Sequence, residues 1–191
     1  MDDPISRFQE RFDEAKLKES GDATAAALAT ADRAARPSVR IVLLKDFSEK
    51  GFVFYTNFGS SKASDLAQNP QAALCFFWPT LAEQVRIEGT VSRVSEAEAD
   101  AYFKSRPHES QVGAWASKQS RSLDSRTTLE SRFDDFKKQF KKGEVPRPEF
   151  WGGYCLSPKR IEFWNAGDYR LHDRDHYIKD GDCWKHELLF P

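Results

Sequence analysis

The sequence has little cysteine and no paired cysteine motif. Its 191 residues include three cysteines, Cys75, Cys155 and Cys183. They are far apart and lie outside any Cys-x-x-Cys or Cys/His metal spacing. An odd number of scattered cysteines is typical of reduced structural thiols, so we expect neither a disulfide framework nor a metal site.

Long apolar runs and an excess of one charge are also lacking. No apolar run approaches the length needed to span a membrane. The first residues, MDDPISRFQERF, have neither the apolar core of a signal peptide nor the Arg-rich character of a transit peptide. The formal net charge of -1 provides no broad positive field for nucleic acid or an anionic membrane. We therefore expect a soluble cytoplasmic protein with no nucleic-acid or membrane partner.

Large apolar side chains are abundant by contrast. Hydrophobic residues make up 39% of the chain, with 15 Phe and 5 Trp, which is enough apolar area for a packed core. A chain of this length suits one well-cored domain better than a two-domain enzyme with an interdomain cleft. We therefore expect a single domain over residues 1–191, with a site that a second subunit would complete.

Three segments have the pattern of helices. Helical spacing of apolar residues after Asp3-Pro4 predicts a helix over about 4–19. Ser95 and Glu98 predict a capping box for a helix that ends near Arg106, since the residue before a proline resists the α conformation. A third helix, from about Asp124 to Lys142, is predicted by one apolar stripe, which consists of Leu129, Phe133, Phe136 and Phe140.

Strands dominate the rest of the chain. A short helix is expected over 59–69, between the third and fourth strands. Five strands are predicted in the first half of the chain: AALATA, SVRIVLL, GFVFYTNF, AALCFFW and QVRIEGTVSRV. Four more are predicted over about 151–191: GGYCLSP, RIEFWNA, YRLHDRDHYI and DCWKHELLF. The fold class is therefore mainly β with peripheral helices, as a closed or partly closed β-barrel.

The segment YTNFGSSK at 55–62 has the composition of a phosphate cradle. A strand passes through Gly59 into a helix that begins near Ser60, where free N–H groups, two hydroxyls and Lys62 would surround an anion. The alternative is an ordinary N-cap serine.

The strand RIVLLK at 40–45 carries a cation at each end of an apolar run. Its four apolar residues predict a strand covered on both faces. Strand geometry directs Arg40 and Lys45 to opposite faces, where two separate phosphates would satisfy them. Strand-end residues in contact with water are the alternative.

Tyr102, Arg106 and Ser110 are spaced by four residues, so they would converge on one anion even with a break at Pro107. A solvated helix face is the alternative.

In RLHDR, strand alternation places Arg170, His172 and Arg174 on one face, where three potential cations favour a negative ligand. On sequence alone, Trp164 is expected in the core.

Taken in order, these motifs carry a family resemblance over nearly the whole chain. RIVLLK, GFVFYTN, SSKASDLAQNP, QVRIEG, SRPHESQVGAWASKQS, WGGY, RIEFW and RLHDR resemble the pyridoxamine 5'-phosphate oxidase family. The resemblance implies a split β-barrel homodimer that binds flavin mononucleotide (FMN) at the subunit interface. The residues about 151–191 would complete that site.

The resemblance also implies roles for individual residues. FMN contacts would fall on Arg40, Ile41, Val42, Leu43, Leu44, Lys45, Tyr55, Thr56, Ser61, Lys62, Gln84, Gln119, Ser120, Trp164 and Arg174. Substrate would be bound by Lys45, Tyr102, Arg106, Ser110, Arg170, Leu171 and His172, with Arg170 and His172 as the catalytic candidates. Ser61 stands where the family commonly has arginine, which predicts a modest loss of FMN affinity.

The implied reaction oxidises pyridoxine or pyridoxamine 5'-phosphate to pyridoxal 5'-phosphate. A hydride would pass from substrate C4' to flavin N5, and O2 would be reduced to H2O2. Two alternatives keep the fold: a split-barrel flavin oxidase of the phenazine type, and a non-catalytic carrier of flavin or pyridoxal phosphate. The trio of Tyr102, Arg106 and Ser110 argues against the first, and Arg170 with His172 against the second.

Overall fold

One antiparallel sheet runs through the computed structural model, which describes residues 3–140 and 144–191. Its hydrogen-bonded order is β2-β1-β5-β6-β7-β4-β3, and β8 and β9 extend it from β7. The strands are β1 (Ala25–Ala31), β2 (Pro37–Leu43), β3 (Asp46–Ser48), β4 (Gly51–Asn57), β5 (Gln71–Trp78), β6 (Glu83–Arg93), β7 (Trp151–Asn165), β8 (Asp173–Asp180) and β9 (Cys183–Leu188).

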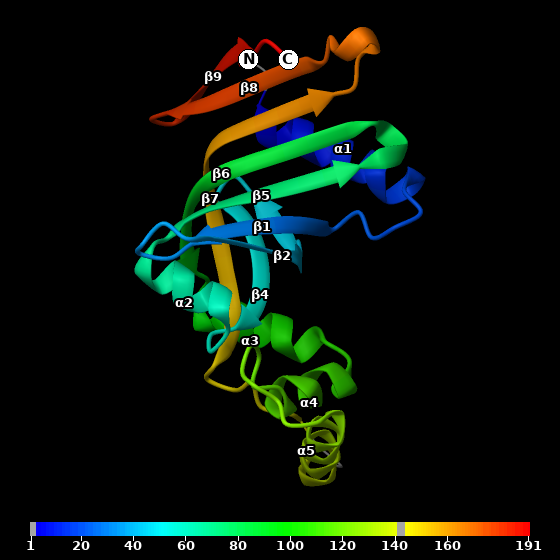
Figure 1. Ribbon diagram of the computed structural model, residues 1–191, viewed down its shortest axis with the longest axis vertical. Helices are drawn as coiled ribbons and strands as arrows, with labels where there is room; N and C mark the ends of the chain where they lie inside the picture. The colour runs from blue at the N-terminus through cyan, green and yellow to red at the C-terminus, as the bar shows by residue number, and fades with distance from the viewer. Residues whose placement is uncertain (1–2, 141–143) are drawn as a thin grey trace.

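The sheet curls into a partly closed barrel. Strand β7 pairs with β4 through its first half and with β6 along nearly all of its length, and its second half also pairs with β8. Strand β2 packs close to β4, although the two do not form a ladder. Figure 1 shows the long strands β6 and β7 passing from the barrel toward the β8–β9 hairpin. The predicted mainly β class is confirmed.

Helices occupy the connections between strands, as predicted. The helical elements are α1 (Pro4–Lys18), α2 (Ser61–Gln68), α3 (Glu96–Ser105), α4 (His108–Ala116) and α5 (Arg126–Gln139), with short 3-10 turns η1 (Pro79–Leu81) and η2 (Asp168–Arg170). Among the described residues, no helix is both long and apolar enough to cross a bilayer.

The main core lies between α1 and the barrel. Phe8 is fully buried and its ring meets Phe52 and Phe76 edge-on, at centroid distances of 5.0 and 5.3 Å. Phe12 stacks against Phe8 at 5.5 Å and also packs on Trp78. Burying a large aromatic side chain stabilises a fold by about 2–3 kcal/mol, so α1 is an integral part of the barrel.

A second core cluster holds α3, α4 and α5 against one end of the barrel. Phe103, Val112 and Trp151 are buried in it, and Phe136 and Phe140 of α5 pack against its edge. Figure 1 shows these three helices below the sheet, at the end opposite the β8–β9 hairpin. The apolar stripe of α5 is therefore used within the protomer, and the predicted end of this helix at Lys142 lies outside the described residues.

The local helix signals are confirmed. Asp3 caps α1 by accepting hydrogen bonds from the backbone of Ile5 and Ser6. Ser95 and Glu98 form the expected reciprocal capping box, and α3 stops before Pro107, which precedes α4. Each of these boundaries is set by residues close together in sequence.

Two predicted strand features are wrong, and one strand was missed. GGYCLSP and RIEFWNA are one continuous strand, β7, because pairing with β6 carries the chain through Pro158 at a bulge opposite Gly89. The short strand β3 was not expected. Strand β2 is not covered on both faces of the protomer: Val42 is buried, whereas Val39 and Ile41 are 69% and 65% exposed.

Candidate active site

A cleft of about 440 Å³ lies where β4 meets α3 and α4. Eight predicted site residues line it: Leu43, Lys45, Tyr55, Thr56, Tyr102, Arg106, Ser110 and, from the loop after α4, Gln119. The structure therefore brings together side chains that are up to 76 residues apart in sequence. The lining also includes Trp151, Asn57 and Ser117, which were not predicted as site residues.

An aromatic stack forms one wall of this cleft. The rings of Tyr55 and Tyr102 are nearly parallel with centroids 3.9 Å apart, and Trp151 continues the stack at 5.4 Å from Tyr55. Burial raises the pKa of Tyr55 to about 12, so its hydroxyl stays protonated as a hydrogen-bond donor. Trp151 belongs to the WGGY motif, and its position at the start of a strand beside two glycines was the available signal.

Arg106 is the principal cation of the cleft. It caps the C-terminus of α3, and its guanidinium lies 4.7 Å from the centre of the Trp151 ring. Its Nη1 atom is buried and has no hydrogen-bond partner among the residues that the structure describes. Burial lowers the pKa of Arg106, with Tyr102 opposing the shift. A buried donor without an acceptor is costly, and an anionic ligand would supply the missing acceptor.

Lys62 anchors the neighbouring phosphate cradle. Its Nζ donates to Thr56 Oγ1 at 3.1 Å and to Gln119 Oε1 at 3.0 Å, and it lies 3.4 Å from Ser60 Oγ. Ser60 is fully buried at the N-cap of α2, but its side chain makes no capping hydrogen bond. Burial lowers the pKa of Lys62, and the nearby charge of Arg40 lowers it further.

This cradle fits the phosphate of a flavin. The α2 N-terminus, the Lys62 ammonium and the Thr56 hydroxyl are donors of the kind that bind phosphate. Ser61 lies at the first position of α2 and is exposed, so it adds a hydroxyl where an arginine would add a charge. Ser120, with a positive φ of 65°, is exposed and does not line the cleft.

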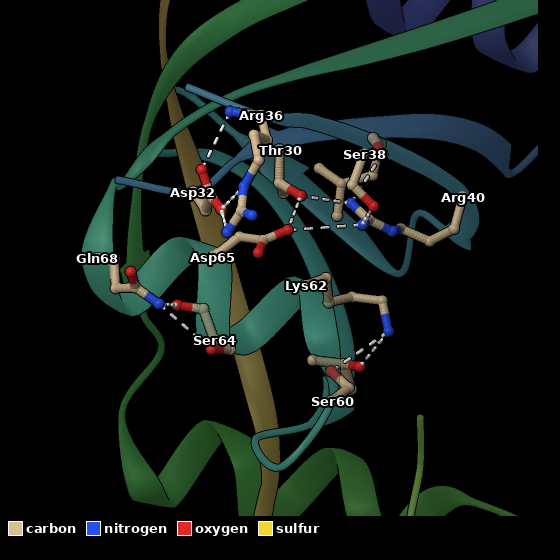
Figure 2. Close-up of polar contacts among 12 residues, drawn as sticks. Thr30, Asp32, Arg36, Ser38, Arg40, Ser60, Lys62, Ser64, Asp65 and Gln68 are labelled. Atoms are coloured by element: carbon tan, nitrogen blue, oxygen red, sulfur yellow. Dashed lines mark hydrogen bonds and ion pairs between the residues drawn. The ribbon is translucent and has the colours of Figure 1, made fainter. Parts of the chain in front are cut away.

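Arg40 and Lys45 have different surroundings. Lys45 follows β2 and lines the cleft with Arg106. Arg40 turns inward, where Nη1 donates to Thr30 Oγ1 at 2.7 Å. Figure 2 shows the Arg40 guanidinium meeting Thr30, Ser38 and Asp65, while the Lys62 ammonium turns toward Ser60.

The predicted residues of β6, β7 and the RLHDR segment form a second group at the other end of the molecule, whereas Val42 and Leu44 are buried in the main core. Gln84, Trp164 and Arg174 are register neighbours across β6, β7 and β8. His172 lies beside Trp164, with ring centroids 4.6 Å apart, and its Nδ1 accepts a hydrogen bond from the backbone N–H of Gly167. Trp164 is half-buried, so the expectation that it lies in the core is wrong.

The RLHDR segment is not a strand throughout. Residues Asp168–Arg170 form η2, in which Tyr169 and Arg170 have positive φ angles of 55° and 66°, and β8 begins at Asp173. Arg170 and Leu171 are exposed. The predicted alternation of Arg170, His172 and Arg174 on one strand face is therefore wrong, because a turn separates the first from the third.

The two groups are separated within one protomer. Figure 1 shows η2 and the start of β8 at one end of the molecule and α3–α4 at the other. None of Gln84, Trp164, His172 and Arg174 lines the cleft that contains Arg106. One chain thus presents two separate groups of predicted site residues.

Family models match nearly the whole chain. A model described as pyridoxamine 5'-phosphate oxidase matches residues 12–140, and one described as the pyridoxine 5'-phosphate oxidase C-terminal dimerisation region matches residues 151–191. A pyridoxine/pyridoxamine 5'-phosphate oxidase of Anaeromyxobacter dehalogenans is 54% identical over 99% of this chain and 96% of its own length. The protein of the same name from Myxococcus xanthus strain DK1622 is 50% identical, over 99% and 92%.

Solved structures confirm the split-barrel fold. PhzG from Burkholderia lata, in complex with tetrahydrophenazine-1-carboxylic acid, superposes with a TM-score of 0.93 at 29% identity, covering 99% of this chain and 93% of that one. A pyridoxamine 5'-phosphate oxidase-related, FMN-binding protein of Nostoc punctiforme superposes at 0.78 with 17% identity, covering 96% and 97%.

Proposed function

The chain belongs to the pyridoxamine 5'-phosphate oxidase family and is an oxidase, and from that premise we propose that it converts pyridoxine 5'-phosphate and pyridoxamine 5'-phosphate to pyridoxal 5'-phosphate. The observation that carries this proposal is the buried Nη1 of Arg106, which has no hydrogen-bond partner among the residues that the structure describes, in a side chain that lines the same cleft as Lys45, Tyr102 and Ser110. Two cations and two hydroxyls are a suitable set for the phosphate of the substrate.

The proposed cofactor is FMN. Lys62, Thr56 and the α2 N-terminus would hold its phosphate, with Arg40 nearby, and Gln119 is fixed by hydrogen bonds from Thr56 and Lys62. When bound, the flavin would supply the redox chemistry of the proposed reaction, which is hydride transfer from substrate C4' to flavin N5 followed by reduction of O2 to H2O2. Residues of this chain would then supply binding and orientation.

Arg170 and His172 are the proposed catalytic residues. Arg170 lies on an exposed turn with a positive φ, and His172 is held by the Gly167 backbone and by Trp164. Backbone strain of this kind often lies at functional sites. Arg170 would steer C4' over the flavin ring, and His172 would orient the substrate or handle a proton.

The proposed active form is a homodimer, which would bring together the two partial sites from different protomers. The exposed apolar residues Val39 and Ile41 on β2 and Phe77 on β5 form surface that a second copy would bury. The C-terminal match to a region named for dimerisation supports the same arrangement. The proposed location is the cytoplasm.

A phenazine-type oxidation is the second candidate, because the PhzG structure superposes so well. The phenazine compound named in that structure carries a carboxylate, whereas the vitamer carries a phosphate, which has more negative charge and more acceptor oxygens. Two cations and two hydroxyls around Arg106 suit the phosphate better.

Anaerobic mixing tests the proposal. Pyridoxine 5'-phosphate should bleach the visible absorbance of the bound flavin, whereas unphosphorylated pyridoxine at the same concentration should leave it unchanged. Arg170→Ala should retain the flavin colour and lose most of the bleaching rate. A protein that binds no flavin, or whose flavin is reduced equally by both compounds, would contradict the assignment.

A further inference from the structure

Arg40 lies beside the proposed flavin phosphate site but is bound by residues of its own chain. Its Nη1 donates to Thr30 Oγ1 at 2.7 Å and to the Leu28 carbonyl at 3.2 Å, and its Nη2 donates to Ser38 Oγ at 2.5 Å. The Thr30 hydroxyl in turn donates to Asp65 Oδ2 at 2.7 Å. A hydrogen-bonded relay therefore connects Arg40 on β2 to Asp65 on α2 through β1.

Asp65 is the anion at the end of this relay. Its Oδ2 is 3.7 Å from Arg40 Nη2, and the two side chains are only 16% and 19% exposed. Opposite charges this close and this shielded from water attract each other more strongly than a surface pair does. Asp65 therefore provides a counter-ion for Arg40 without a phosphate.

Asp65 also lies one helical turn after Lys62 on α2. Lys62 and Arg40 are close enough for the positive charge of Arg40 to lower the pKa of Lys62. A phosphate bound to Lys62 and Arg40 would thus lie close to the negatively charged carboxylate of Asp65. Figure 2 shows Asp65 and Lys62 rising from the same helix on either side of this region.

We propose that Asp65 is a positioning residue that neutralises Arg40 in the absence of phosphate and weakens binding of phosphorylated flavin by competing for the same cation. Its effect adds to that of Ser61, so that α2 contributes one cation, Lys62, and one opposing anion. This inference rests on the proposed function, since it takes the phosphate of FMN as the ligand of Arg40 and Lys62.

Asp65→Asn tests this role, because the amide oxygen can still accept the hydrogen bond from Thr30 while the charge is removed. Dissociation constants of FMN and of riboflavin would be measured by flavin fluorescence on the flavin-free protein. We expect FMN to bind about three- to tenfold more tightly to the variant. Riboflavin has no phosphate, so its affinity should not change. The Asp65→Gln variant, whose side chain is neutral but longer, should also bind FMN more tightly relative to riboflavin.

Asp180→Asn is the matched control, since Asp180 lies at the end of β8 and pairs with Lys185. It should leave both flavin affinities at their wild-type values. An unchanged or weaker FMN affinity in both Asp65 variants, or an equal gain for riboflavin, would overturn the role of Asp65 while leaving the proposed function intact. A wild-type protein that binds neither flavin would overturn both.

Discussion

At the scale of single residues, Arg106 is the reason we expect this cleft to select an anion. It stacks on Trp151 and leaves Nη1 buried without an acceptor among the described residues. Lysine has no planar group to stack and offers its donors around one point charge. The position therefore requires the shape of arginine as well as its charge.

Arg106→Lys should raise the KM for pyridoxine 5'-phosphate by about ten- to a hundredfold, which corresponds to the loss of a charge-assisted hydrogen bond. Flavin affinity should be unaffected, because the proposed site for the flavin phosphate is at Lys62, whose hydrogen bonds do not involve Arg106. Steady-state kinetics and a flavin titration on the same preparation check both points. A KM within twofold of wild type would show that Arg106 does not bind substrate.

At the scale of elements, α1 is attached to the C-terminal hairpin by polar contacts as well as by its aromatic core. Arg7 Nη2 lies 2.8 Å from Asp175 Oδ2, and His186 Nε2 lies 2.7 Å from Asp175 Oδ1. Burial alone would raise the pKa of Asp175, but the hydrogen bonds from Arg7 and His186 outweigh it, and the pKa is lowered below its ordinary value of 3.8.

A carboxyl group whose pKa is lowered on folding stabilises the protein while it is ionised. This contribution is complete above the ordinary pKa of 3.8 and is lost as the pH falls further, through the lowered pKa of the folded state. Asp175→Asn should therefore reduce the free energy of unfolding at pH 7 by about 1–2 kcal/mol. The difference from wild type should shrink below pH 3.8. Urea unfolding across this range measures it, and a difference that is constant with pH would contradict the account.

The elements also show what can be predicted from sequence. The caps at Asp3 and Ser95 and the break before Pro107 depend on neighbours within a few residues, and all were predicted. The turn at Tyr169–Arg170 was not, because it depends on Gly167, where a Cβ would lie 2.0 Å from the Leu171 carbonyl oxygen. Strand β7 continues through Pro158 because a distant strand, β6, pairs with it.

The same distinction, between features set by neighbours in sequence and features set by distant parts of the fold, applies to the site. Residues of one motif, such as Lys62 with Thr56, were grouped correctly from their order along the chain. Trp151 was missed because its place in the cleft follows from the pairing of β7 with β4. Asp65 was missed because its significance comes from Thr30 and Arg40, which reach it only in the folded barrel.

At the scale of the whole molecule, one protomer presents two separate groups of predicted site residues and a strand, β2, with exposed apolar side chains. Ile41→Glu places a charge on the β2 surface, where Ile41 is 65% exposed. The variant should shift from dimer to monomer in size-exclusion chromatography with light scattering, because a buried unpaired carboxylate is costly. Ala34→Glu, at the exposed turn before β2, should stay dimeric. A dimeric Ile41 variant would exclude this face from the interface.

The stoichiometry of the aerobic reaction tests the central claim most directly. Purified protein would be supplied with pyridoxine 5'-phosphate and O2, and pyridoxal 5'-phosphate and H2O2 would be measured together. The account predicts equal amounts of aldehyde and peroxide, and no aldehyde from unphosphorylated pyridoxine at the same concentration. A flavin-loaded protein that forms no aldehyde, or that oxidises only an unphosphorylated substrate, would contradict it.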